Sequence, residues 1–187
     1  YDIFTDLYTH SLLVNHKNKS PLNDIVDKIY CINVEKNTNK LNNFLKQINK
    51  YNIDCEILIV KLLKNNKKFN TLVTELLKNN DRVLSCGQLG NLISITLCLL
   101  DAYVNKYKNI IIFEDDIILK KTFNDDVLNL KTLFHSNEYI YIGASQWNWD
   151  LIDKKSPWYT KLTDKYYNPL RTTGSFASYI NKNIYNI

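Results

Sequence analysis

The sequence predicts one α/β domain in which a mostly parallel sheet is flanked by helices. Its 187 residues, 45% of them hydrophobic, suffice for a single domain with a real core. From residue 25 onward, segments with strand-like patterns alternate with segments of helical periodicity, which is typical of β-α-β units. The run NIIIFEDDIIL at residues 109–119 has the apolar character of a strand buried on both faces.

The individual elements follow from hydrophobic spacing. Residues 1–24 mix aromatic and polar side chains around Pro21, so we expect an irregular arm or a short helix there, leading into a domain over residues 25–187. Short apolar runs predict strands at residues 25–34, 55–60, 109–119, 138–144 and 172–181. Apolar residues at spacings of three and four predict helices at residues 39–51, within 61–82, and at 88–106 and 123–134. In such a sheet, we expect ligands to bind beyond the carboxyl ends of the strands.

The segment after residue 144 is rich in aromatic residues and contains two prolines. These aromatic residues are Trp147, Trp149, Trp158, Tyr159, Tyr166 and Tyr167. Aromatic rings in loops can stack on sugars, yet they more often form a small satellite core over a sheet edge. We favour the packing role.

Composition argues against two classes of function. The net charge of +5 comes almost entirely from lysine, with Arg82 and Arg171 as the only arginines. Because the arginine clusters that read bases or clamp phosphates are missing, we expect no nucleic-acid binding. The longest apolar stretch, residues 89–104, is interrupted by Asn91 and Asp101, and we expect no membrane span.

Cysteine and histidine usage gives no sign of a zinc site or a disulfide framework. The four cysteines include no CxxC pair and lie mostly in predicted strands or helices, which favours buried thiols and a reducing compartment. The three histidines show no metal-ligand spacing. The chain begins with Tyr1 and lacks methionine, which indicates a processed form or a piece of a longer protein.

Three consecutive acids, Glu114, Asp115 and Asp116, interrupt the apolar run at residues 109–119. Burying an unpaired carboxylate is costly, so such a group shifts its pKa, meets a cation or lies where the strand reaches a cleft. Side chains alternate along a strand, so Glu114 and Asp116 would share one face and Asp115 the other. This pattern favours a metal clamp, and the alternative is that the acids only end a strand and begin a turn.

Four blocks of the sequence resemble glycosyltransferase family 25, which includes lipooligosaccharide and procollagen galactosyltransferases. The blocks are IYCINVEKNTNKL at residues 29–41, LSCGQLGNLIS at 84–94, IIIFEDDIIL at 110–119 and TTGSFASYINKN at 172–183. The E-D-D strand is the specific block, and the order and spacing of all four fit the family. The family's pattern continues beyond the last block, so we expect the C-terminal part of the catalytic domain to be missing from this chain.

The resemblance implies a GT-A-like (Rossmann-like) fold and a nucleotide-sugar donor, usually a UDP-sugar. It implies transfer of a hexose, galactose or glucose, to a hydroxyl of a glycan or of a hydroxylysine-type protein acceptor. It also implies Mn²⁺ or Mg²⁺, since a divalent cation that bridges carboxylates and diphosphate stabilises the charge of the leaving group.

The resemblance also assigns roles to individual residues. Glu114, Asp115 and Asp116 match the metal-binding motif, with Asp116 as the strongest ligand and a catalytic candidate. The residues that match donor-binding positions are Asn33, Glu35, Lys36, Lys40, Gly87 and Gln88, with Gly90 as the second glycine of its block.

An inverting transfer needs a general base near the acceptor oxygen. Asp150 is the second candidate catalytic residue, and Asp153 and Asp164 in the same aromatic-rich segment are alternatives to it.

The chain departs from the family pattern at several positions. Gln88, Asn91 and Ile95 stand where the family usually has an acid, often a cysteine and commonly a histidine. Asn37 and Lys40 replace frequent arginines, and lysine cannot form a bidentate phosphate fork. These departures support a second hypothesis, a catalytically silent GT-A-like module that recognises glycans or organises a larger protein. A metal-dependent phosphohydrolase ranks third, because the expected nucleophile spacing is not evident.

Overall fold

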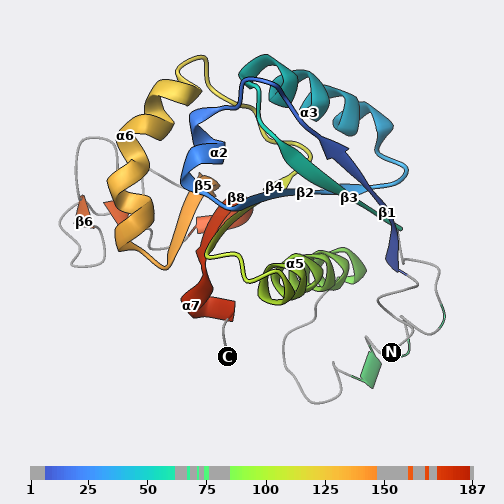
Figure 1. Ribbon diagram of the computed structural model, residues 1–187. Helices are drawn as coiled ribbons and strands as arrows, with labels where there is room; N and C mark the ends of the chain where they lie inside the picture. The colour runs from blue at the N-terminus through green and yellow to red at the C-terminus, as the bar shows by residue number, and fades with distance from the viewer. Residues whose placement is uncertain are drawn as a thin grey trace.

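In the computed structural model, residues 7–61, 85–146 and 172–185 are described, together with residues 67, 71, 74–75, 160–161 and 167–168. The described chain forms a six-stranded sheet in the order β1-β3-β2-β4-β8-β5, and β6 pairs with β7 separately (Figure 1). The strands are β1 (Tyr8–Val14), β2 (Lys28–Val34), β3 (Cys55–Val60), β4 (Asn109–Glu114), β5 (Tyr139–Gln146), β6 (Thr160–Lys161), β7 (Tyr167–Asn168) and β8 (Thr172–Asn181). The helices are α2 (Pro21–Ile25), α3 (Thr38–Tyr51), α5 (Cys86–Val104), α6 (Phe123–Ser136) and α7 (Lys182–Tyr185).

Two apolar layers cover the two faces of this sheet. On one face, α3 and α6 contribute Phe44 and Phe134 to the core. On the other face, α5 and α7 contribute Cys98 and Tyr185 (Figure 1). Because both faces are covered, every residue from Ile110 to Phe113 in β4 is buried. This explains why the central strands read as continuous apolar runs.

The prediction of a mostly parallel sheet is wrong in its detail, because the sheet is mixed. β2 pairs in parallel with β3 and with β4. The pairings β1–β3, β4–β8 and β5–β8 are antiparallel. A hydrophobic pattern reports which faces of a strand are buried and not the direction in which the strand runs, so the sequence did not reveal this. The three strands β2, β3 and β4 nevertheless run parallel, so their carboxyl ends lie together at the same end of the sheet.

In the region where an irregular arm or a short helix was expected, residues 8–14 form a strand of the sheet, and a short helix is present at Pro21–Ile25. β1 forms an edge strand antiparallel to β3, and the short helix α2 follows it. Most residues of β1 are exposed, so the strand lacks the buried apolar pattern by which the other strands were recognised.

The predicted boundaries agree with the structure elsewhere, except that the strand predicted from residue 25 begins at Lys28, because Ile25 ends helix α2. β3 and β8 have the predicted limits, and α3, α5 and α6 lie within two residues of theirs. β4 is shorter than predicted because it ends at Glu114, so Asp115 and Asp116 lie in the turn that follows. The helix predicted within residues 61–82 and the side chains of the aromatic-rich segment lie mostly outside the described residues.

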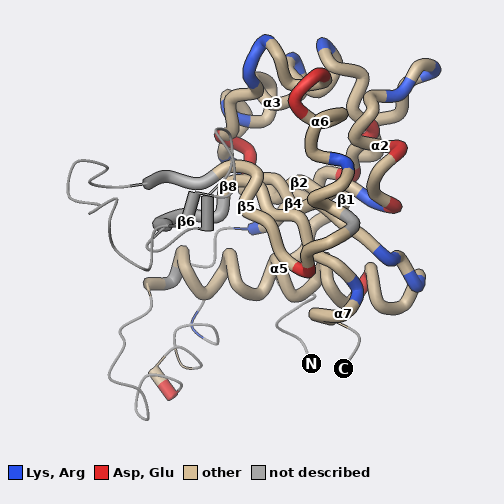
Figure 2. Tube along the Cα trace, turned by 90° about the vertical axis from the view of Figure 1, so that its left-hand side faces the viewer, with Lys and Arg blue, Asp and Glu red and all other residues tan. Residues whose placement is uncertain are grey.

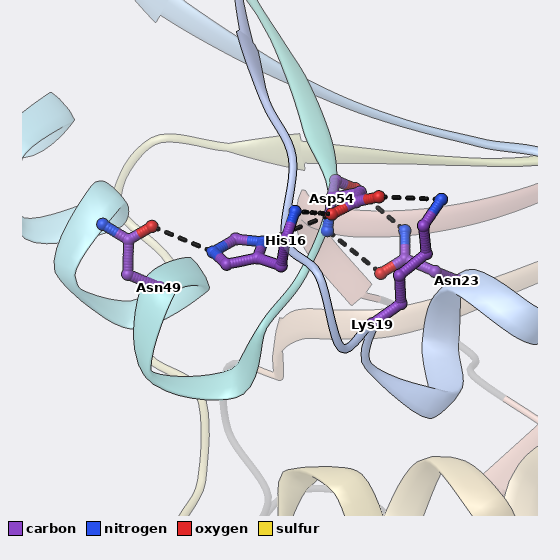
Figure 3. Close-up of polar contacts among 5 residues, drawn as sticks. All are labelled: His16, Lys19, Asn23, Asn49 and Asp54. Carbon is purple, nitrogen blue, oxygen red and sulfur yellow. Dashed lines mark hydrogen bonds and ion pairs between the residues drawn. The ribbon is translucent and has the colours of Figure 1, made fainter.

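A polar cluster ties the segment after β1 to the start of β3 (Figure 3). The backbone N–H of His16 donates to Asp54 Oδ1 at 2.6 Å, and Lys19 Nζ lies 2.9 Å from Asp54 Oδ2. The Asn23 side chain donates to the Asp54 carbonyl at 2.9 Å and accepts from the Asp54 N–H at 3.0 Å. His16 Nε2 lies 3.1 Å from Asn49 Oδ1 at the end of α3. We call these five residues the Asp54 cluster.

Helix α5 bears on the expectation that no segment spans a membrane. Among the described residues, its segment Gly87–Val104 is the one that is long and apolar enough to do so, with a mean hydropathy of 1.2. The core helix of a globular protein meets the same criteria. Two polar residues that interrupt the segment couple α5 to the sheet, since Asp101 accepts a hydrogen bond from Tyr30 and Asn91 donates one to Glu114.

One expectation from composition, that of buried thiols, agrees with the described residues. Cys31, Cys55 and Cys98 are free buried thiols, and burial raises the pKa of each one. Lysines are spread over several elements rather than along one stripe (Figure 2), and the expectation that the chain binds no nucleic acid stays a prediction.

Candidate functional site

A cavity of about 310 Å³ opens where the carboxyl ends of β2, β3 and β4 meet. This is the edge at which α/β sheets bind their ligands. Apolar residues from the strand ends, small and polar residues from α5, and charged residues line the cavity. They are Leu7, Ile32, Val34, Asn37, Lys40, Val60, Lys61, Gly87, Gln88, Gly90, Asn91, Ser94, Glu114, Asp115 and Asp116.

The three consecutive acids lie together at this cavity, and we call them the acid row. They do not all contact the same partner. Glu114 Oε1 accepts a hydrogen bond from Asn91 Nδ2 on α5 at 3.3 Å. Asp115 Oδ2 accepts one from Asn33 Nδ2 on β2 at 2.6 Å. The predicted alternation along a strand does not extend to Asp116, because β4 has already ended at Glu114.

Lys40, in the first turn of α3, connects the other two acids. Its Nζ donates to Asp116 Oδ2 at 3.0 Å and lies 3.7 Å from Asp115 Oδ1. The hydrogen bond to Asp116 raises the pKa of Lys40, with further contributions from the negative charges of the row. Asp115 and Asp116 therefore share the ammonium group of Lys40. The prediction had instead placed Glu114 and Asp116 together on one face of the strand.

Among the described residues, Lys40 is the one cation paired with the three carboxylates of the acid row. Burial, followed by repulsion from Asp116, raises the pKa of Glu114 above its ordinary value. Burial also raises the pKa of Asp115, although the Asn33 amide and Lys40 oppose it. Ionised carboxylates in such surroundings are stabilised by any additional cation.

Asn33 is a buried polar residue beside the acid row. Its side chain is 1% exposed, and its amide nitrogen also approaches the Asn37 carbonyl at 3.4 Å. Its oxygen Oδ1 has no hydrogen-bond partner among the described residues. Buried polar atoms are nearly always paired, so this oxygen is an exception, although Asn33 is not among the residues that line the cavity.

The start of α5 forms the opposite wall of the cavity. Ser85 Oγ accepts from the Gln88 N–H at 3.2 Å, and the Ser85 N–H donates to Gln88 Oε1 at 2.8 Å, which makes a capping box. A capping box takes glutamine as well as glutamate, so the family departure at Gln88 preserves the helix start. A Cβ at Gly90 would meet no atom within 4 Å, so this glycine leaves open space.

The departure at Ile95 has a different structural meaning. Ile95 packs against the apolar layer on the α5 side of the sheet and does not line the cavity. An apolar residue at this position therefore serves core packing and removes no polar group from the cavity wall.

The structure brings together most of the predicted site residues, but not all. Glu35 and Lys36 are exposed in the turn after β2 and do not line the cavity. Asp150, Asp153 and Asp164 lie outside the described residues. The assigned roles of these five residues remain predictions.

Sequence reasoning missed Asn91 and Ser94 as cavity residues. Both lie on the helix face that carries Gly87 and Gly90, because residues three or four positions apart are neighbours on a helix. Ser94 Oγ donates back to the Gly90 carbonyl at 2.8 Å. A stripe of small and polar residues along an otherwise apolar helix was the signal that could have identified this wall.

The chemistry of the acid row fits a hard divalent cation. Carboxylates are the oxygen ligands that Mg²⁺ and similar ions take. Burial raises the pKa values of Glu114 and Asp115, and a bound cation would favour the ionised forms of both groups. Among the described residues, however, no three His, Cys, Asp or Glu side chains are already arranged to hold a metal ion. The assignment of a metal to this row therefore stays a prediction.

The fold and the cavity define the class of the protein, an α/β protein with a cavity at the carboxyl ends of its parallel strands. Within this class, the chain belongs to glycosyltransferase family 25 (LPS biosynthesis protein), because the family profile matches residues 26–186. The family comprises UDP-sugar hexosyltransferases and implies a GT-A-like fold and a nucleotide-sugar donor. The resemblance seen in the four sequence blocks is thus confirmed. No curated protein matches the chain significantly.

Proposed function

We propose that the chain transfers galactose or glucose from a UDP-sugar to a hydroxyl of a glycan or of a hydroxylysine-type acceptor, with Mn²⁺ or Mg²⁺ at the acid row. The bond between the sugar C1 and the diphosphate oxygen breaks, and UDP leaves with the electron pair. The acceptor oxygen bonds to C1, and its proton passes to a base. The observation that carries the proposal is the under-neutralised acid row at a cavity mouth, in a chain of this family.

The acid row would hold the cation through Glu114, Asp115 and Asp116. Asp116 is the best-placed first ligand because its side chain is 40% exposed, whereas that of Asp115 is 9% exposed. The cation supplies positive charge that offsets the negative charge developing on the diphosphate. Asn33 and Asn91 hold the Asp115 and Glu114 carboxylates in place through their amide hydrogen bonds.

The remaining walls would bind and shield the donor. Gly87 and Gly90 let a ligand come close to the first turns of α5, where the helix dipole favours negatively charged groups. The apolar floor, with Ile32 and Val60, excludes water from that side of the donor. We assign the general base to Asp150, with Asp153 and Asp164 as alternatives, on chemical grounds alone.

Calorimetric titration with UDP tests this proposal. The native chain should bind UDP with Mn²⁺ present and much more weakly without it. Asp116→Ala should abolish the Mn²⁺-dependent part, whereas Asp125→Asn, an exposed acid in the first turn of α6, should leave it intact. UDP binding that is absent, or that is independent of metal, would contradict the proposal. Asp150→Asn should bind UDP normally and lose turnover if this residue is the base.

A second candidate is a catalytically silent module that binds glycans. The contact between Asn91 and Glu114 favours it, because this amide occupies a carboxylate oxygen at a position where the family often carries a cysteine. The two candidates differ in turnover. The silent module releases no UDP from a UDP-sugar when hydroxyl acceptors are added, whereas the transferase does.

A further inference from the structure

Lys40 occupies the position at which the acid row most needs positive charge. Its ammonium group lies within 3.0 Å of Asp116 and 3.7 Å of Asp115. Among the described residues, it is the one cation that forms an ion pair with the row. A divalent cation bound by the same oxygens would be repelled strongly by an ammonium at this distance.

We propose that Lys40 is an exchangeable counter-ion. In the free protein it pairs with Asp115 and Asp116, the incoming divalent cation displaces it from them, and it then pairs with the diphosphate of the donor. The inference rests on the proposed function, because it requires both a cation and a diphosphate. It gives Lys40 two opposite effects, one against binding of the cation and one in favour of binding of the donor.

The geometry of Lys40 suits such an exchange. Its side chain is 48% exposed, so its ion pairs are of the surface kind that contribute little stability and break readily. Lysine carries a compact charge on a flexible stem with three hydrogen-bond donors, so it can change partners without moving its backbone. The backbone of α3 is fixed by Phe44 and Ile48, which are fully buried in the core.

The ion pairs of Lys40 also distinguish it from Lys61, the other lysine at the cavity. Lys61 lines the same cavity and is exposed, but it forms no ion pair with a carboxylate among the described residues. General attraction of a lysine for a nucleotide would apply to both residues, whereas competition with a cation for Asp115 and Asp116 would apply to Lys40 only. Lys61 is therefore a matched control.

Titration of Mn²⁺ followed by electron paramagnetic resonance, with and without UDP, tests the inference. In the absence of UDP, Lys40→Gln should bind Mn²⁺ about 3- to 10-fold more tightly than the native chain, as expected from loss of a surface-type ion pair. With saturating Mn²⁺, the same variant should bind UDP at least about 3-fold more weakly. Lys40→Arg keeps the charge and should bind Mn²⁺ as the native chain does, and Lys61→Gln should not tighten Mn²⁺ binding to the same extent.

The outcomes separate this inference from the proposed function. If the native chain binds neither Mn²⁺ nor UDP, both ideas fail. If the native chain binds both ligands but Lys40→Gln shifts the two affinities in the same direction, the role of Lys40 alone is overturned. An equal gain in Mn²⁺ affinity for Lys61→Gln would also overturn it, because the effect would then be one of net charge. Circular dichroism of each variant identifies any that fail to fold. If Lys40→Gln fails to fold, the Mn²⁺ and UDP affinities of Lys40→Arg decide whether Lys40 has the proposed role.

Discussion

The carboxylate of Asp54 and the carboxylates of the acid row lie at opposite ends of the parallel strands, and their charges are neutralised to different degrees. Asp54 lies at the amino end of β3 with Lys19 and the His16 N–H beside it (Figure 3). Burial alone would raise the pKa of Asp54, but these two partners lower it below the usual range. At the carboxyl end of β4, burial outweighs the partners of Glu114 and Asp115, and their pKa values are raised.

This contrast separates a carboxylate whose ionisation stabilises the fold from carboxylates whose ionisation opposes folding. Ionised Asp54 favours the folded state, so its cluster fastens the segment after β1 to the sheet. Ionisation of Glu114 and Asp115 opposes folding unless a cation binds to them. Sites that retain groups at a cost in stability are commonly sites of binding or catalysis. The comparison therefore predicts that substitutions at the two ends will change stability in opposite directions.

The largest expected effect is the loss of stability in Asp54→Ala. This change leaves Lys19 and the His16 N–H without their partner and should cost about 1–3 kcal/mol of unfolding free energy. Denaturant titration measures the loss, with the exposed Asp24→Ala as a control. Mn²⁺-dependent UDP binding should stay unchanged. A weakened affinity for UDP would show that the Asp54 cluster is not purely structural.

Asp115→Asn should have the opposite effect on stability. The asparagine oxygen can still accept the hydrogen bond of Asn33, while the cost of a buried negative charge disappears. We expect a gain of about 1 kcal/mol in unfolding free energy, together with a loss of Mn²⁺-dependent UDP binding of at least about 10-fold. A variant that is less stable than the native chain would contradict the view that ionised Asp115 opposes folding.

The same comparison predicts that the two groups of carboxylates change the stability of the fold with pH in different ways. The pKa of Asp54 is lowered on folding, so its contribution is present above the ordinary carboxyl pKa of about 4 and is lost as the pH falls further. The pKa values of Glu114 and Asp115 are raised on folding, so their cost is absent below about pH 4 and develops as the pH rises through the raised values.

Chemical unfolding at a series of pH values checks the direction in which each carboxylate changes stability with pH. The stability gain of Asp115→Asn should grow as the pH rises from about 4 towards 7. The stability loss of Asp54→Ala should shrink as the pH falls below about 4. A pH-independent difference for either variant would show that the shift in its pKa does not contribute to folding.

The smallest expected effect on stability is that of Gly90→Ala. Alanine in a helix interior is favoured over glycine by about 0.5–1 kcal/mol, and the added Cβ meets no atom within 4 Å. The variant should therefore unfold at a higher temperature than the native chain. The methyl group narrows the wall at which we place the donor, so UDP affinity should fall. Unchanged affinity would place the nucleotide away from α5.

The sequence supported the local parts of this account better than the long-range parts. The limits of β3 and β8 and the acid row follow from patterns within about ten residues of each other. The contacts that define the site join Lys40 to Asp116 and Asn33 to Asp115, which are 76 and 82 residues apart. Local periodicity carries no information about which helix start faces which strand end, and only the family resemblance drew attention to Lys40 and Asn33.

Two features were missed for related physical reasons. β1 is an exposed edge strand, so its mixed sequence resembles that of a loop, and its pairing with β3 depends on residues far along the chain. Asn91 was noted as a departure from the family and as an interruption of an apolar stretch, but not as a cavity residue, because its contact with Glu114 appears once α5 is packed against the sheet.

The central claim is that the acid row binds a divalent cation together with the diphosphate of the donor. A crystal structure of the chain soaked with Mn²⁺ and a UDP-sugar tests it most directly, because anomalous scattering locates the manganese independently of the nucleotide. We expect the manganese peak between the Asp116 carboxylate and the diphosphate, with Lys40 turned from the acids towards the phosphate oxygens. A nucleotide bound without manganese, or a manganese site away from Glu114, Asp115 and Asp116, would contradict the account.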